Sequence, residues 1–137
     1  MAMFDPSEWS LDDSQEPYAL PDGTEAKLRI LSVEKPVERE DGTSYMTARM
    51  EVVDHPYSKE VSAFLEIPNA KVLDAKRLNN ARHRMKEFMS YFGLDGTRVF
   101  DPTEDWPLRE GWVILSMRTS PEYGDQNRIA KYLPTSR

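Results

Sequence analysis

Aromatic and cationic side chains recur on one face of three segments that alternate between apolar and polar residues. The alternation has the period of two residues expected of strands with one buried face. The side chains predicted to share the opposite, outer face are Lys27, Arg29, Tyr45, Arg49 and Phe64. Aromatic rings stack on bases and cations contact phosphates, so this face has the chemistry of a surface for single-stranded nucleic acid.

Phe64 is the most informative of these residues, because it stands among polar residues in EVSAFLEIP, residues 60–68. A strand with one solvated face normally turns its large apolar side chains inward. Taken alone, Phe64 fits packing under the N-terminal segment or a loop as well as it fits base stacking. Its predicted proximity to Tyr45 and Arg49 favours a ligand-binding face.

A second group of candidates lies in SPEYGDQNRIAKYLP, residues 120–134. We expect Tyr123 at a loop tip beside Gly124, with Arg128 and Lys131 on the strand that follows. In small Greek-key barrels such a loop often borders the ligand, so these three side chains are predicted to contact nucleic acid.

A basic stretch follows the third predicted strand. Residues 71–87 hold six Lys or Arg residues against two acidic ones. A basic helix surface can contact phosphates, but such a run also fits a solvated face or a docking surface for the acidic N-terminal segment. These alternatives stay open at the level of sequence.

The sequence contains no motif typical of an enzyme. It has no cysteine and two histidines, too few for a zinc site, and it lacks a nucleophile elbow and a phosphate-binding glycine-rich loop. PDGTEAK, residues 21–27, superficially resembles the acid-acid-lysine set of metal-dependent nucleases, but its members lie too close together in sequence. We therefore expect no catalysis, metal or cofactor.

Period-two segments and one period-3.6 segment give the order of elements. The strands are predicted at 26–36, 44–54, 60–68, 111–119 and 127–134, and a helix at 71–92 between the third and fourth. The phase of the alternation changes within 26–36, which predicts a bulge. This order predicts a mostly β fold, a five-stranded OB-fold Greek-key barrel with the helix plugging one end. A split antiparallel sheet with one helix would have the same order of elements, so it stays an alternative.

Charge divides the 137 residues into an N-terminal arm, 1–22, and a single domain, 23–137. The arm contains six acidic residues and no Lys or Arg, which accounts for the whole net charge of −6. We expect an extended, flexible or docking segment whose Met3, Phe4, Trp9 and Leu11 contact the body or a partner. No apolar run approaches the roughly 20 residues of a membrane span, so no membrane association is expected.

GWVILSMRTSPEYGDQNRIAKYLP, residues 111–134, resembles the ending of a family of small bacteriophage proteins formerly catalogued as a domain of unknown function. The matching positions are Gly111, Tyr123, Gly124, Asn127, Ile129 and Pro134. LPDGTEAKLRILSVEKP, residues 20–36, resembles the first strand of that family. The resemblance implies an OB-fold single-stranded-DNA-binding protein of phage replication or recombination, acting in the cytoplasm of an infected bacterium.

The sequence thus predicts single-stranded DNA binding with little sequence preference. As a further hypothesis, the acidic arm competes with DNA for the basic surface or recruits a phage or host replication or recombination protein. The alternatives are a protein-interaction module on the same barrel and, less favoured, a metal-dependent nuclease. The oligomeric state stays open, a homodimer included.

Overall fold

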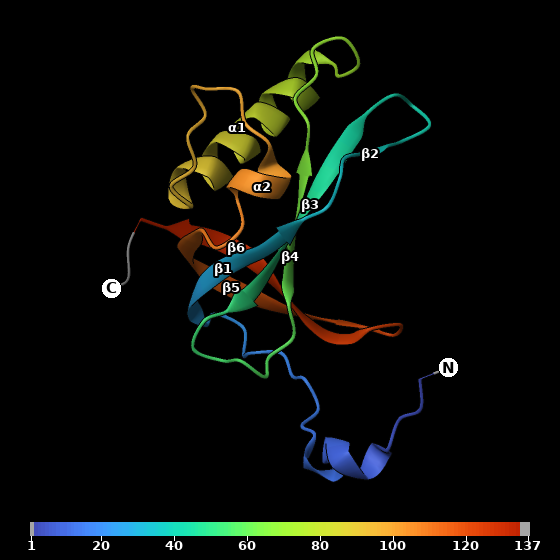
Figure 1. The fold of residues 1–137 in the computed structure, drawn as a ribbon. Coiled ribbons are helices and arrows are strands. Elements are labelled where there is room, and N and C mark those ends of the chain that lie inside the picture. Colours follow the sequence, from blue (N-terminus) through green and yellow to red (C-terminus); the bar gives the residue numbers. More distant parts are fainter. Residues whose placement is uncertain (1, 135–137) are drawn as a thin grey trace.

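The computed structural model describes residues 2–134, which form one curled antiparallel sheet and one long helix (Figure 1). The helix α1 (Ala75–Tyr91) lies between the fourth and fifth strands in sequence, and a short α2 (Pro102–Asp105) follows it. The strands are β1 (Glu25–Val33), β2 (Val37–Glu38), β3 (Ser44–Val52), β4 (Val61–Glu66), β5 (Glu110–Ser120) and β6 (Gly124–Leu133). The expectation of a mostly β chain with one long helix is confirmed.

The structure has six strands where five were predicted. The additional strand, β2, has two residues, which pair with Ser44 and Tyr45 of β3 in the hairpin around Asp41–Gly42. Residues 94–110, where no element was predicted, contain α2, which begins where the Asp101 carboxylate accepts a hydrogen bond from the Thr103 amide at 3.0 Å. Elements of two and four residues are too short to carry a detectable sequence period.

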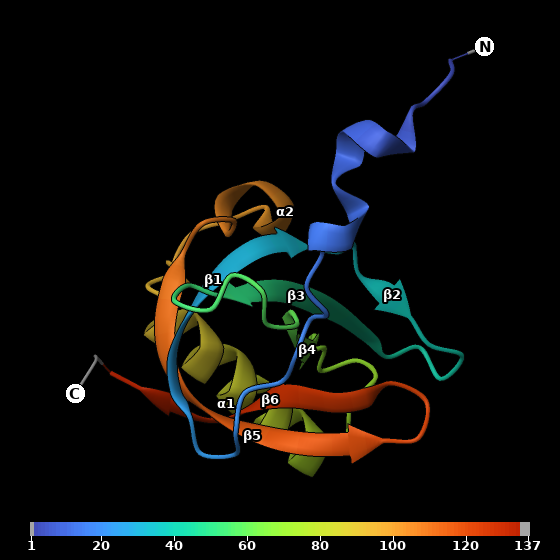
Figure 2. The same ribbon diagram turned by 90° about the horizontal axis from the view of Figure 1, so that it is seen from below.

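The sheet order is β2-β3-β1-β5-β6, with β4 paired to the other side of β3. The sheet curls so that β4 lies against β6, and α1 packs across both strands (Figure 2). No hydrogen-bonded ladder joins β4 to β6 within residues 2–134. The result is a barrel-like sheet with an open seam between its two edge strands, β4 and β6.

The core lies inside this curl. Residues on the inner face of β1, β3 and β5 are buried, as are Phe88 of α1, Phe92 directly after α1 and Trp106 after α2. The predicted bulge in the first strand is confirmed: the register between β1 and β3 shifts between Ile30 and Ser32. It lets the strand bend around the core while both of its ends stay paired.

Local signals fix the ends of α1. Asp74 caps its first turn by accepting from the Arg77 amide at 2.9 Å, so the helix begins at residue 75 and not at 71 as predicted. Gly93, directly after the predicted helix 71–92, has φ +66, a left-handed conformation that favours glycine and ends helices. Gly111 is needed for packing, since a Cβ there would lie 3.0 Å from the Tyr91 carbonyl oxygen.

The N-terminal arm projects away from the barrel in both views (Figures 1 and 2). It is not fully extended as predicted, because two 3-10 turns form, η1 (Pro6–Trp9) and η2 (Leu11–Asp13). The Asp5 carboxylate caps η1 by accepting from the Ser7 amide at 3.0 Å. None of the helices in the described part of the chain has the length and apolarity needed to cross a bilayer.

Candidate functional site

Phe64 stands at the junction of three hollows on the surface. They have volumes of about 460, 350 and 670 Å³, and Phe64 lines each of them. Its side chain is 62% exposed, although it lies in the middle of β4. We call these joined hollows the Phe64 groove; it follows the open seam between β4 and β6 and reaches α1 at one end.

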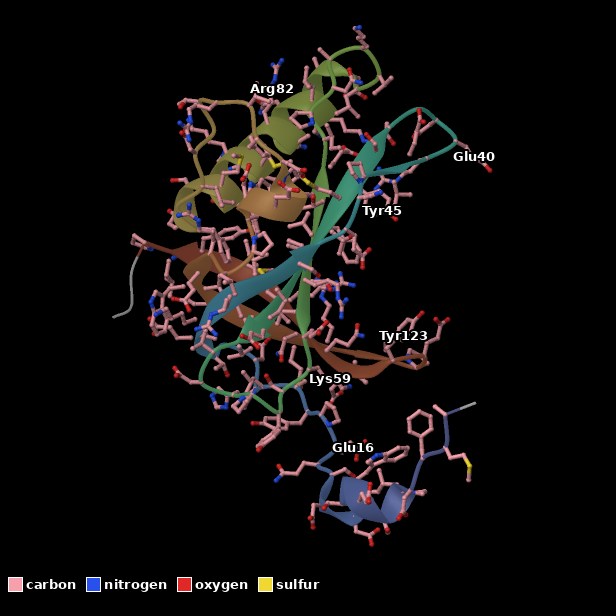
Figure 3. All side chains as sticks on the ribbon, viewed as in Figure 1. Glu16, Glu40, Tyr45, Lys59, Arg82 and Tyr123 are labelled. Carbon is pink, nitrogen blue, oxygen red and sulfur yellow. The ribbon has the colours of Figure 1, made fainter. Side chains whose placement is uncertain are left out.

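Aromatic side chains mark the length of this groove. Tyr123 lines the first hollow and is 66% exposed in the turn between β5 and β6. Tyr45 lines the second, with its ring centroid 6.2 Å from that of Phe64. Figure 3 shows Tyr45 toward the β2 end of the molecule and Tyr123 at the tip of the β5–β6 hairpin. The groove therefore has one ring at its centre and one toward each end.

Three arginines in the groove make no ion pair with any described residue. Arg128 lines two of the hollows, Arg84 lines two, and Arg118 lines one. They come from three different elements, β6, α1 and β5. Guanidinium groups without a carboxylate partner are free to bind phosphate.

The cations predicted on β1 behave differently. The Lys27 amine lies 3.2 Å from the Glu110 carboxylate, and Arg29 contacts both Glu110, at 2.7 Å, and Glu51, at 3.1 Å. Hydrogen bonds from Arg29 and then Lys27 hold the pKa of the Glu110 carboxyl below its usual value. Both cations are thus neutralised by neighbouring glutamates, and neither lines the groove.

Arg49 lies at the rim of the groove, opposite Ser62 in the β3–β4 ladder. Its guanidinium makes two hydrogen bonds to one oxygen of Glu60, at 3.0 and 2.6 Å. These hydrogen bonds raise the pKa of Arg49. To reach a phosphate, Arg49 would have to leave Glu60, which itself lines the first hollow.

Tyr45 is also engaged within the protein. The Arg39 guanidinium lies 4.5 Å above its ring, in cation–π geometry. Arg39 and Arg77 both pair with Glu66, at 2.9 and 2.7 Å, and the hydrogen bond from Arg77 is the main cause of a lowered Glu66 pKa. Tyr45 therefore supports Phe64 from the side, while Phe64 keeps a free ring face.

The backbone at the tip of the β5–β6 hairpin is held by Lys59, which lies before β4 in the chain. The Lys59 amine donates to the carbonyl oxygens of Tyr123, at 3.3 Å, and Asp125, at 2.7 Å. Lys131 is exposed on β6 and lines none of the three hollows. Its neighbour Tyr132 packs against the core, with its ring stacked on Tyr91 at 5.5 Å.

The arm is tied to the floor of the groove through Asn127. This buried side chain accepts from the Leu20 amide at 2.8 Å and donates to the Leu20 carbonyl at 2.9 Å. It also donates to the Ser116 carbonyl at 3.2 Å. Asn127 lines the first hollow, so the same residue anchors the arm and borders the groove.

Arg84 belongs to the basic stretch 71–87, whose role the sequence left open, and Arg118 was not predicted as a site residue. Arg77, Asn80 and Arg84 line the second hollow together, at the spacings of three and four that place residues on one helix face. That spacing is visible in the sequence, but it does not tell which face turns toward the sheet. For Arg118 no comparable signal exists.

Within residues 2–134, no three His, Asp or Glu side chains gather as a metal ion would require. No protein-family model matches the chain, and no curated protein is similar enough in sequence to count as a relative.

Proposed function

We propose that this protein binds single-stranded DNA in the Phe64 groove, without catalysis and with little sequence preference. The observation that carries the proposal is the exposed Phe64 ring among arginines that have no carboxylate partner within residues 2–134. A base that stacks on an exposed ring contributes roughly 1–3 kcal/mol, and any base can do so because each has a π-face. Unpaired guanidinium groups hold the phosphates that link the bases.

The groove suggests how a strand would lie. One base stacks on Phe64, and another on Tyr123, which Lys59 holds in place through the Tyr123 carbonyl. Arg128, beside both rings, contacts the phosphates between them. Arg84 contacts the next phosphate toward α1. In this arrangement Lys27 and Arg29 serve the fold through their glutamate partners and leave the contact with DNA to the arginines of the groove.

We further propose that the barrel-like sheet is an OB-fold. Its support is the pairing order β4-β3-β1-β5-β6, with α1 between β4 and β5 and across the β4–β6 seam. The OB-fold has five main strands and uses one face with the adjoining loops for oligonucleotides; β2 would then be an extension of β1. Together with the resemblance of residues 111–134, this order supports a bacteriophage replication or recombination role in the bacterial cytoplasm.

Fluorescence-polarisation titration with labelled single- and double-stranded oligonucleotides at about 50 and 200 mM salt tests the proposal. We expect preference for the single strand and weaker binding at the higher salt. Arg128→Gln should reduce the slope of log affinity against log salt by about 0.7. The matched control is Arg109→Gln, an exposed arginine outside the groove. Absence of single-strand binding at the lower salt would reject the function.

A protein-binding role on the same surface is the second candidate. It is favoured by the paired cations Lys27, Arg29 and Arg49, which leave the outer face of β1 and β3 close to neutral. In that case Phe64 and Tyr45 would form an apolar anchor for a partner. Failure of the titration, with the protein folded, would make this the leading candidate.

A further inference from the structure

A fourth hollow lies away from the Phe64 groove, between α1 and the loop that follows it. It has a volume of about 530 Å³, and Met85, Met89 and Leu94 form its apolar floor. Arg82 and Lys86 border it, and neither makes an ion pair with a described residue. Methionine-lined surfaces adapt their shape and make favourable contacts with aromatic rings. Asp95, which pairs with Arg98 at 3.3 Å, also lines the hollow. The hollow thus combines an apolar floor with a rim that carries two cations and one carboxylate.

The N-terminal arm has the complementary character. Its large apolar side chains are uncovered, with Phe4 at 74% and Trp9 at 52% exposure, and their rings lie 5.7 Å apart. The acidic residues of the arm surround them, and no Lys or Arg precedes Lys27. An aromatic pair of this size exposes apolar area that a monomer normally covers. The arm therefore carries an uncovered apolar, acidic docking element.

We infer that the arm of one copy docks into the α1 hollow of a second copy. The arm leaves the body at the end opposite α1 (Figure 1). Figure 3 shows Arg82 pointing into solvent at the far end of the molecule from Glu16. Phe4 and Trp9 would cover the methionine floor, and the arm's carboxylates would pair with Arg82 and Lys86. Exchange of arms between two copies closes a dimer; one-way docking builds chains.

Sedimentation velocity of the full chain over a concentration series, without DNA, tests this contact. The weight-average mass should rise above the monomer value of 15.9 kDa as the protein concentration increases. It should fall again when added salt screens the charges of Arg82 and Lys86. Phe4→Ala with Trp9→Ala should weaken self-association about tenfold or more. Arg82→Glu with Lys86→Glu should do the same. All four residues are exposed, and circular dichroism verifies folding. Val37→Ser, an exposed apolar residue elsewhere, should change nothing.

Mixing the two double variants separates docking between copies from docking within one copy. The mixture contains an intact arm on one variant and an intact hollow on the other. Association should therefore return in the mixture although each variant alone stays monomeric. A wild-type mass that stays at 15.9 kDa, variants that associate like the wild type, or a mixture that stays monomeric would each overturn the inference. DNA binding is not involved in any of these readouts.

Discussion

Replacing Phe64 with alanine removes the ring at the centre of the groove while leaving the fold in place. The side chain is 62% exposed, and its one ring contact is Tyr45, with centroids 6.2 Å apart. A cross-strand aromatic pair contributes about 0.2–1 kcal/mol to stability, so the free energy of unfolding should fall by no more than that. Loss of a stacked base costs about 1–3 kcal/mol in binding, which is roughly a 5- to 150-fold increase in Kd.

Fluorescence polarisation with a labelled oligothymidylate measures this Kd, and urea unfolding monitors stability in parallel. Tyr57→Ala is the matched control, because Tyr57 is 57% exposed and lines none of the hollows of the groove. We expect its Kd to stay at the wild-type value. A folded Phe64→Ala variant that binds DNA with the wild-type Kd would show that no base stacks on Phe64. A variant that unfolds would show instead that Phe64 belongs to the core.

Three further changes test other parts of the structure. Glu60→Gln releases Arg49 from its carboxylate and should tighten oligonucleotide binding roughly two- to fivefold at low salt; weaker binding would contradict this. Asn127→Ala leaves both polar groups of the Leu20 backbone without their partner and should cost about 1–3 kcal/mol in urea unfolding, whereas an unchanged midpoint would speak against the anchor. Burial raises the pKa of Tyr132 to about 12, so the folded state keeps that proton above pH 10. The free energy of unfolding should then fall as the pH rises from about 10 to 12, and Tyr132→Phe should remove the slope.

Much of the fold could be predicted because the sequence features that determine it lie within or next to the elements themselves. The bulge near Ile30 follows from a change of phase within one strand. The end of α1 follows from Gly93, and the hairpin follows from Asp41–Gly42. In contrast, α2 depends on a neighbour distant in sequence, because its C-cap residue Trp106 packs against Phe88 at 5.6 Å. The strand β2 pairs with nearby residues of β3, but it has only two residues. A period of two or 3.6 cannot reveal elements that short.

The candidate site was harder to predict, because ion pairing is decided by residues far apart in sequence. Lys27 and Arg29 face outward as alternation suggests, but their partner Glu110 is about 80 positions away. Conversely, Arg118 makes no ion pair with a described residue, and it lines the same hollow as Phe64 because the sheet curls β4 against β6. Alternation gives the face of a side chain, and the three-dimensional fold decides whether its charge is available.

Photocrosslinking of a bound oligothymidylate substituted with 5-iodouracil, followed by mass spectrometry of the peptides, shows directly whether single-stranded DNA lies in the Phe64 groove. Stacking on exposed rings predicts crosslinks at Phe64 and Tyr123, both lost in excess unlabelled single strand. Crosslinks confined to the β1 face around Lys27 and Arg29, or to the arm, would contradict the assignment of the groove as the DNA-binding site.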